Sequence, residues 1–555
     1  MTMYRNRDVR RKTPIANIAM YAVMGVLGYF FFKPLFPNPM YQYAVGGACA
    51  LLFAVVHQLW MWSPARMRKA NRFAIEEYRK EQGRLTFKEA KKAGLVVKGP
   101  SLPLASLEKS DKLRSTQMIG MPMDKLEGHT LVVGATRSGK GMHLTRTLYE
   151  ADCAMIVVDP KGEQRFRTAA YRAEHVGPIY TIPGNTLDLA RYFDLGQNDH
   201  LTELHFHLLK PWADKQPIFG EKAKFLFAAA HSYAADHGLN PMMVLLDAAN
   251  SAPATTLEEL RKSDYDNVMN FTNGDEPDNL DKFAASSWGN FATRMFDYQQ
   301  HWHTLTTGNN LAAIPLNWAE EKATIYITYP FDVLKGVSGA VSGMISALLR
   351  YQKMNDRKDR IIAAVDELPV VGLRNVSEYL ATVGGYNISL LLYVQTYSQL
   401  SKMYGERDAE TILSNCHHQV WYPPSDIITA KRMSELFGTK LEPLQAYSHK
   451  DEDKAFIPDL GIRTKGRSVS LQYRPALTPE EMVALPKDHV ICQIDRRHVI
   501  RAYRLWPVPE FRNIVPPPYE IEVDATRAPA PWGPSFAAPV VRPDDVEEAF
   551  FDPTE

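Results

Sequence analysis

The stretch LVVGATRSGKG at Leu131–Gly141 decides the fold, together with MIVVDPKGE at Met155–Glu163. The first stretch predicts a short buried strand that runs into a glycine-rich turn and then a helix. In that arrangement backbone N–H groups converge on a β-phosphate, and a lysine ammonium reaches the β/γ oxygens. The second stretch predicts a parallel strand one helical crossover later. We therefore expect a phosphate loop made of Gly134, Ala135, Thr136, Arg137, Ser138, Gly139, Lys140, Gly141 and Met142.

One position departs from the usual phosphate-loop pattern. A serine or threonine normally follows the lysine and ligates Mg²⁺, whereas Gly141 stands there in this chain. A relaxed GxxxxGK sequence also arises by chance, so the loop alone indicates nucleotide binding only weakly. The strands that follow therefore decide the interpretation.

Two later strands end in polar side chains suited to nucleotide hydrolysis. RIIAAVDEL at Arg360–Leu368 ends in Asp366, placed to hold Mg²⁺ through water, and Glu367, which can polarise an attacking water. Alone, the pattern would fit a buried strand that ends in a solvated acidic turn. NISLLLYVQT then ends in Gln395, either a sensor of the γ-phosphate or a simple polar cap of the strand. Together these strands predict an α/β, RecA-like NTPase fold with ATP and Mg²⁺ as cofactors.

Composition limits the partners. The 555 residues contain 64 lysines and arginines and 63 aspartates and glutamates, so no global basic field indicates nucleic acid. Any contact with DNA must come from local loops. The four cysteines have no CxxC spacing, which favours buried reduced thiols. His205-Phe206-His207, which alternates as on a strand face, and Cys416-His417-His418 lack partners at zinc spacing, so we assign them no metal.

The N-terminus predicts a membrane hairpin. Ile15–Phe32 and Met40–Trp62 are uncharged runs long enough to span a bilayer, joined only by KPLFPNP. Basic residues precede the first run and follow the second, and the loop holds only Lys33, so both ends are expected in the cytoplasm. A signal peptide is disfavoured because a second span follows the first. Ser63-Pro64 then predicts the start of a basic helix that ends near Gly83.

The remaining chain shows a strand-helix alternation with one interruption. From about 196 to 310 strand patterns vanish and helical patterns dominate, which predicts an all-helical insertion within the NTPase sheet. The predicted domains are the hairpin at 1–62, a membrane-proximal helix and linker at 63–127, the NTPase domain at 128–195 and 311–512, the helical insertion at 196–310, and a disordered, proline-rich acidic tail at 513–555.

With these features together, the chain resembles the TraG/TraD-like coupling ATPases of type IV secretion and conjugation systems. The resemblance rests on the hairpin, GATRSGKG, VVDPKGE, the helical insertion and VDEL. It also rests on LYVQTYSQL at 392–400, TAKRMSELFG at 429–438 and SVSLQYRPALTPEEMVALPKDHVI at 468–491. It implies that Gly141 is a family feature, because relatives often carry Gly-Lys-Gly, and that Asp366, water and nucleotide phosphates hold Mg²⁺. Glu367 would be the catalytic carboxylate and Gln395 the sensor.

The resemblance also implies a biological role. The protein would be a homo-hexameric motor in the bacterial inner membrane that recruits relaxase-bound DNA, or effector proteins, and hands them to the inner-membrane components of a type IV secretion channel. Two alternatives stay open. One is a DNA-translocating ATPase of the FtsK or HerA kind, although those usually lack the helical insertion. The other is a docking platform for secretion substrates whose nucleotide site has no motor role.

Overall fold

The computed structural model describes residues 14–36, 38–61, 64–108, 117–213, 221–305, 311–354, 358–448 and 466–506. The chain forms two compact units, which are described separately below. Unit 1 consists of Met1–Leu85 and Ser434–Thr478, and unit 2 of Thr86–Met433 and Pro479–Glu555. The basic residues before Lys12, Lys12 itself and the predicted acidic tail at 513–555 lie outside the described residues.

Unit 1 begins with two apolar helices joined by a short turn. They are α1 (Pro14–Phe32) and α2 (Pro39–Met61), with the 3₁₀ turn η2 (Lys33–Leu35) between them. Within the described residues, Pro39–His57 is long and apolar enough to cross a membrane, and only 11% of it is buried. The helix at Phe331–Lys353 passes the same test but is 72% buried, as a core helix would be, and Met20–Leu35 is a shorter apolar helix.

Glycines let α1 and α2 pack closely. A Cβ atom added at Gly28 would lie 2.6 Å from Cys49 Cβ, and one at Gly46 would lie 3.0 Å from the Gly25 carbonyl oxygen. Real Cβ atoms are not found at the shorter distance, so only glycine fits at position 28. This use of small residues at a helix crossing is typical of helix pairs in membranes.

The rest of unit 1 contains a helix beside a two-stranded ribbon. The predicted basic helix is α3 (Pro64–Glu81), and the ribbon pairs β11 (Thr439–Ser448) with β12 (Gly466–Pro475) in antiparallel register. The Tyr78 hydroxyl on α3 hydrogen-bonds Thr439 Oγ1 at 2.6 Å, and its ring lies 5.3 Å from that of Tyr473. The sequence analysis did not predict this ribbon or its contact with α3.

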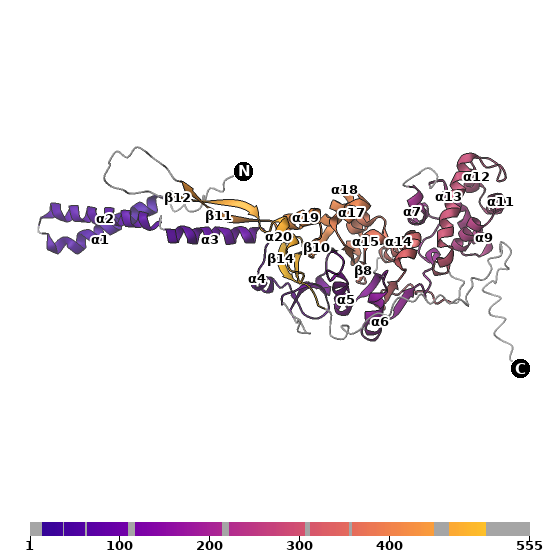
Figure 1. The fold of residues 1–555 in the computed structure, drawn as a ribbon, viewed down its shortest axis with the longest axis horizontal. Coiled ribbons are helices and arrows are strands. Elements are labelled where there is room, and N and C mark those ends of the chain that lie inside the picture. The colour runs from indigo at the N-terminus through magenta and orange to yellow at the C-terminus, as the bar shows by residue number, and fades with distance from the viewer. Residues whose placement is uncertain are drawn as a thin grey trace. The chain divides into compact units, whose positions relative to one another are not determined.

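Unit 2 is built on a twelve-stranded sheet with helices on its faces (Figure 1). The strand order is β1-β3-β2-β14-β13-β10-β4-β9-β8-β5-β7-β6. Seven neighbouring strands run parallel, and their bounds are β4 (His129–Val133), β5 (Ala154–Val158), β6 (Ile179–Ile182), β7 (Thr324–Ile327), β8 (Ile361–Val365), β9 (Ile388–Val394) and β10 (Cys416–Trp421). Almost every residue in these strands is buried, as strands covered on both faces require.

The parallel order sets the position of the predicted site. β4, β9, β8 and β5 are consecutive neighbours, and Gly134, Gln395, Asp366 and Asp159 directly follow them. Since the strands are parallel, all four residues lie at one edge of the sheet. Ligands bind at this edge in open α/β sheets.

The other five strands extend the sheet beyond β10 in antiparallel pairings. They are β1 (Val96–Val97), β2 (Ser101–Ser106), β3 (Met118–Pro122), β13 (His489–Ile494) and β14 (His498–Tyr503). The sequence analysis treated the segment that contains the first three as a helix and linker. That segment is too rich in glycine and proline to show a strand period. Its strands pair mainly with one another, and the pair Ser106–Tyr503 joins them to the rest of the sheet.

The helices of unit 2 fall into those that flank the sheet and those of the insertion. The flanking helices are α4 (Phe87–Lys92), α5 (Lys140–Glu150), α6 (Glu163–His175), α14 (Phe331–Met354), α15 (Leu368–Val371), α16 (Val376–Thr382), α17 (Tyr397–Tyr404), α18 (Glu406–Asn415), α19 (Ile427–Phe437), which ends in unit 1, and α20 (Pro479–Val483). Short 3₁₀ turns are η3 (Met123–Lys125), η4 (Leu189–Arg191), η5 (Gln299–Thr304) and η6 (Val383–Tyr386).

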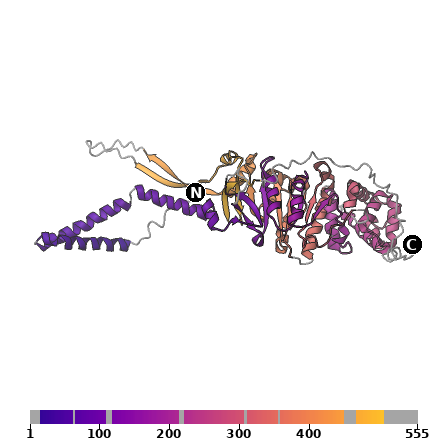
Figure 2. The same cartoon turned by 90° about the horizontal axis from the view of Figure 1, so that it is seen from below.

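The described residues between β6 and β7 are helical and gather at one end of unit 2 (Figure 2). They form α7 (Asn198–Ala213), α9 (Lys224–His237), α10 (Pro241–Asn250), α11 (Pro253–Ser263), α12 (Tyr265–Thr272) and α13 (Lys282–Tyr298). His205 and His207 therefore lie on helix α7, so the expectation of a strand-like alternation was wrong. The His207 ring hydrogen-bonds Ser342 Oγ at 2.9 Å and the Tyr379 hydroxyl at 3.1 Å.

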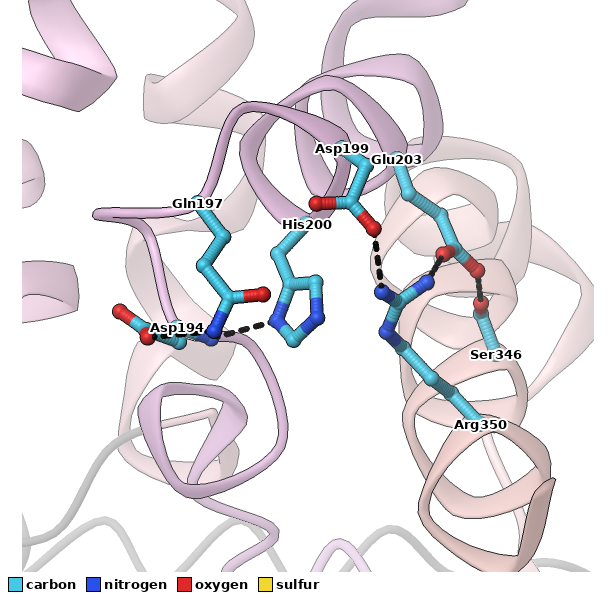
Figure 3. A network of polar contacts seen from close by, with 7 residues as sticks. All are labelled: Asp194, Gln197, Asp199, His200, Glu203, Ser346 and Arg350. Carbon is cyan, nitrogen blue, oxygen red and sulfur yellow. Dashed lines mark hydrogen bonds and ion pairs between the residues drawn. The ribbon is translucent and has the colours of Figure 1, made fainter. Parts of the chain in front are cut away.

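A polar network joins the insertion to helix α14 (Figure 3). Arg350 on α14 pairs with Asp199 at 3.1 Å and with Glu203, both on α7. One turn away, Ser346 donates to Glu203. The Arg350 and Glu203 side chains are 14% and 22% exposed, which strengthens their ion pair relative to one on an open surface. Asp199 is 72% exposed, so solvent screens its pair with Arg350.

Candidate nucleotide site

The predicted phosphate loop connects β4 to α5. Gly134 follows the strand, and its N–H donates to the Val394 carbonyl of β9 at 3.0 Å. Gly139 has φ = 117°, a value that L side chains rarely adopt, and Lys140 begins the helix. A Cβ atom at Gly134 would lie 2.6 Å from Ser138 Oγ, so glycine permits the tight turn. Lys140, Gly141 and Met142 form the first turn of α5, where unpaired N–H groups favour an anion.

The Lys140 side chain turns back toward the loop and the neighbouring strands. Its ammonium donates to the Gly134 carbonyl and lies 3.7 Å from Glu367 Oε1. Both side chains are 7% exposed. Burial lowers the pKa of Lys140, and the charges of Glu367 and Asp366 oppose that shift.

Glu367 connects the lysine to the strand that carries the predicted sensor. Gln395 Nε2 donates to Glu367 Oε2 at 3.0 Å, and Thr136 Oγ1 of the loop donates to Gln395 Oε1 at 3.4 Å. Lys140, Glu367, Gln395 and Thr136 therefore form one continuous chain of polar contacts. The structure thus brings together three elements that the sequence analysis predicted separately.

Glu367 has an uncommon backbone conformation. Its φ of 58° places a non-glycine residue in the left-handed region, at the start of α15. Such a conformation costs about 1–3 kcal/mol and persists where the surroundings fix it. Contacts with Lys140 and Gln395 hold the side chain in this position.

Two further carboxylates lie side by side at the ends of β5 and β8. Asp366 is 7% exposed and Asp159 is 1% exposed. Burial raises the pKa of Asp366 to about 7, with contributions from the charges of Glu367 and Asp159. Burial also raises the pKa of Asp159 to about 6, although backbone N–H groups of Arg165 and Gln164 donate to its Oδ2 at 3.0 and 2.7 Å.

These carboxylates supply the oxygen donors that Mg²⁺ prefers. Asp159 Oδ1 is buried and has no hydrogen-bond partner among the described residues, and Asp366 lies beside it. Among the described residues, no group of three or more His, Cys, Asp or Glu side chains is arranged to hold a metal ion. The carboxylate oxygens of Asp366 and Asp159 fit an ion such as Mg²⁺.

Polar side chains from neighbouring segments lie beside Gly141. Gln164 Nε2 lies 3.4 Å from where a Cβ atom would be, and it donates to the Gly141 carbonyl at 3.2 Å. Thr145 Oγ1 donates to Gln164 Oε1 at 2.7 Å. Gln164, the residue directly after DPKGE, thus fills the space beside the glycine, a contact that the sequence analysis did not predict.

Two other residues near the loop were missed by sequence reasoning. The Tyr422 hydroxyl donates to the Gly139 carbonyl at 3.4 Å, and the Tyr422 Cβ would lie 2.8 Å from a Cβ at Gly134. Arg504, just after β14, reaches within 3.6 Å of a Cβ at Gly139 and stacks on Trp506 at 4.3 Å. Tyr422 follows an apolar strand, which was the available signal, but no local pattern relates Arg504 to the loop.

Comparison with known families and proteins gives a consistent result. The family model described as "Type IV secretory system Conjugative DNA transfer" matches residues 211–506. The Escherichia coli "Conjugal transfer protein TraG" is 26% identical over 406 residues, covering 64% of this chain and 62% of the relative. The match therefore spans less than two thirds of the length of that relative.

Solved structures share the fold. The unbound "Bacterial conjugative coupling protein TrwBdeltaN70" has a TM-score of 0.56 at 16% identity, covering 72% of this chain and 89% of that chain. The "Plasmid coupling protein TrwB in complex with ADP and Mg2+" has a TM-score of 0.55 at 16% identity, covering 77% and 94%. These similarities confirm the predicted RecA-like NTPase fold.

The family model covers more than half of the chain. The chain therefore belongs to the type IV secretory system conjugative DNA transfer family, as a TraG/TrwB-type coupling protein.

Proposed function

We propose that this coupling protein is a membrane-anchored ATPase that powers the transfer of a substrate through a type IV secretion channel. The observation that carries the proposal is the chain of contacts from Thr136 through Gln395 and Glu367 to Lys140. It joins a phosphate-binding loop to a carboxylate and an amide on two neighbouring strands. Nucleotide hydrolysis needs this combination of an anion site, a group that orients water and a group that senses the γ-phosphate.

The loop and the lysine would bind the nucleotide. Backbone N–H groups from Gly134 to Met142 would surround the β-phosphate, and the Lys140 ammonium would leave Glu367 and the Gly134 carbonyl to contact β/γ oxygens. Because Lys140 is buried, its charge acts in a low dielectric and interacts strongly with phosphate.

The acidic residues would have separate roles. Asp366 would hold Mg²⁺ through water, with Asp159 beside it, and bound Mg²⁺ would neutralise charge on the phosphates. Once released from Lys140, Glu367 would accept a proton from the attacking water. Gln395, already hydrogen-bonded to Glu367, would orient that water or sense the γ-phosphate.

The proposal also covers the membrane location, the assembly and the partners of the protein. We propose that α1 and α2 anchor the protein in the bacterial inner membrane with both ends in the cytoplasm, and that the protein works as a homo-hexamer. Its partners would be the inner-membrane components of the channel and either a relaxase-bound DNA strand or effector proteins. The domain boundaries predicted from the sequence remain part of this proposal.

The test replaces Lys140 by alanine. We expect kcat for ATP hydrolysis to fall at least about 100-fold, because the variant loses a charge aimed at the transferred phosphate. Transfer from donor to recipient cells should fall in parallel. Lys91→Ala, which removes an exposed lysine of α4, is the matched control and should retain activity.

A second variant separates hydrolysis from binding. Glu367→Gln should bind ATP with unchanged affinity but hydrolyse it at least about 100-fold more slowly, as seen in single-turnover measurements. Undiminished transfer by Lys140→Ala would contradict the motor role and favour a docking platform instead.

A further inference from the structure

Lys161, in the turn between β5 and α6, is a cation beside the nucleotide site that does not belong to the phosphate loop. It is part of the DPKGE stretch that follows β5, and β5 pairs in parallel with β8, the strand that leads into Asp366. Lys161 therefore stands at the same edge of the sheet as the phosphate loop. Its side chain is exposed, whereas that of Lys140 is buried.

Hydrogen bonds fix the turn that carries Lys161. Asp159 Oδ2 accepts from the N–H groups of Gln164 and Arg165 at 2.7 and 3.0 Å. The Gly162 N–H donates to the Asp159 carbonyl at 3.0 Å, and Gly162 has φ = 67°, in the left-handed region that glycine adopts without steric cost. The backbone at Lys161 is therefore held in one place relative to β5.

The turn lies close to the first turn of α5. Gln164 Nε2 donates to the Gly141 carbonyl at 3.2 Å, which places the start of α6 beside the residue that follows Lys140. Burial raises the pKa of Asp366 to about 7, and the charge of Lys161 acts against that rise. Burial lowers the pKa of Lys140, and the charge of Lys161 adds to that shift. Because charge effects weaken with distance, Lys161 lies near both groups.

The ammonium of Lys161 is held only weakly. Within the part of the chain that the structure describes, it forms no hydrogen bond or ion pair, and Nζ lies 5.9 Å from the centre of the Phe331 ring. A cation at an exposed site and at this distance from a phenyl ring gains little from the contact. Since the lysine stem is flexible, Nζ can turn toward a stronger anion at small cost.

A bound nucleoside triphosphate would bring such an anion to this edge. The carboxylates of Glu367, Asp366 and Asp159 lie there already. They share Lys140 and one Mg²⁺ with the phosphates, so negative charge on the γ-phosphate is only partly neutralised. Lysine and arginine side chains aimed at a transferring phosphoryl group supply the missing charge in sites of this kind.

We propose that Lys161 is a second phosphate ligand, which contacts the γ-phosphate of a bound nucleoside triphosphate and lets the site distinguish triphosphate from diphosphate. The proposal rests on the nucleotide site proposed above. Lys140 would contact the phosphates from the loop, and Lys161 would turn from Phe331 to γ oxygens from the side of β5. A diphosphate has no group at that position, so Lys161 would contribute nothing to its binding.

The test compares the affinities of adenylyl imidodiphosphate, a triphosphate that is not hydrolysed, and of ADP. Each is titrated with Mg²⁺ into the full chain in detergent and followed by calorimetry. Lys161→Gln should bind the triphosphate about tenfold more weakly, the effect of losing one charged hydrogen bond, and ADP with unchanged affinity. Lys161→Arg keeps the charge and should retain most of the preference for triphosphate.

Lys402→Gln is the matched control. Lys402 is an exposed lysine on α17, the helix that follows β9 and Gln395. This variant should bind both nucleotides like the unmodified protein. An equal loss of triphosphate affinity in Lys402→Gln and Lys161→Gln would mean that general surface charge, and not contact by Lys161, attracts the triphosphate, which overturns the proposal.

The two nucleotides separate contact from structural support. If Lys161→Gln weakened binding of ADP and of the triphosphate by the same factor, Lys161 would only support the turn, and the proposal would be wrong. Unchanged affinity for both nucleotides would overturn it as well, while the nucleotide site would stand. Failure of the unmodified protein to bind either nucleotide would instead overturn the nucleotide site, and the role of Lys161 with it.

A thermal melt guards against misfolding of the variant. Because Lys161 is exposed, Lys161→Gln should melt like the unmodified protein when no nucleotide is present. The triphosphate should raise its melting temperature less than that of the unmodified protein, and ADP should raise both equally. An equal rise with the triphosphate in both proteins contradicts the proposal.

Discussion

Buried ionisable side chains determine much of the behaviour of unit 2 at the level of single residues. His129 on β4 is 2% exposed and connects three segments. Its Nε2 contacts the Leu380 carbonyl at 3.0 Å, and the Leu390 N–H donates to its Nδ1 at 3.0 Å. Because Nδ1 accepts a hydrogen bond, the ring is neutral and carries its proton on Nε2. Protonation of Nδ1 would break the bond to β9, the strand beside the phosphate-loop strand.

This arrangement predicts a pH dependence of stability. Burial lowers the pKa of His129 to about 4, below its value of about 6.5 in an unfolded chain. Its stabilising contribution is therefore present above pH 6.5 and is lost as the pH falls toward 4, by up to about 3 kcal/mol. His129→Gln cannot take up a proton at this position. Its melting temperature should therefore fall less between pH 7 and 4.5 than that of the unmodified protein.

The measurement is a thermal melt of both proteins across this pH range. His175→Gln changes an exposed histidine on α6 and should leave the pH dependence as it is. If acidification lowered the melting temperatures of His129→Gln and the unmodified protein equally, burial of neutral His129 would not be the cause of the pH dependence.

The site residues also indicate what sequence reasoning can and cannot reach. Gly134, Lys140, Asp366, Glu367 and Gln395 follow apolar strands in recognisable motifs, so their shared position could be predicted from the parallel order. Their catalytic and binding roles stay predictions. Contacts such as Tyr422 with Gly139 depend on chain segments far apart in sequence and leave no local pattern.

At the level of elements, strands with continuous apolar runs were predicted correctly, whereas those that depend on pairing were not. β4, β5, β8 and β9 each contain at least five consecutive buried residues. β1 has two residues, and β11 and β12 form a two-stranded ribbon. Strands of the latter kind are stabilised by their partners, so propensity and periodicity detect them poorly.

The pairing of α1 and α2 gives a prediction at the same scale. Gly28→Leu should force the helices apart, because even a Cβ atom would lie 2.6 Å from Cys49 Cβ. Overpacking of this kind costs about 1–3 kcal/mol. The expected result is a lower melting temperature of the purified protein in detergent. The melting temperature is measured from the reactivity of the cysteine thiols as the sample is heated.

Gly47→Leu is the matched control on α2. A Cβ atom at Gly47 would have no neighbour within 4 Å, so a leucine should be accommodated there. Similar destabilisation by both substitutions would show that the close crossing at Gly28 does not limit stability.

On the scale of the whole molecule, Arg350 joins the helical insertion to helix α14 of unit 2 (Figure 3). Arg350→Met should keep the apolar part of the side chain and remove both ion pairs, leaving Glu203 and Asp199 without this cation. We expect hydrogen exchange in α7 to become several-fold faster, because the half-buried pair with Glu203 is lost. Exchange in β4 and α5 should stay unchanged, because they do not contact the network.

Lys353→Met, at an exposed position on α14 close to Arg350, is the comparison variant. Its exchange in α7 should match that of the unmodified protein. If hydrogen exchange in α7 were unaltered in Arg350→Met, apolar packing alone would hold α7 against α14.

The strand order of unit 2 has a consequence for biosynthesis. The strand at His129–Val133 lies between those at Ile388–Val394 and Cys416–Trp421, so neither neighbour exists until the ribosome has made more than two thirds of the chain. The apolar helices at Pro14–Phe32 and Pro39–Met61 emerge long before that point. In the nascent chain both apolar helices are therefore complete while the strand that leads into the predicted phosphate loop still lacks its two neighbours in the sheet.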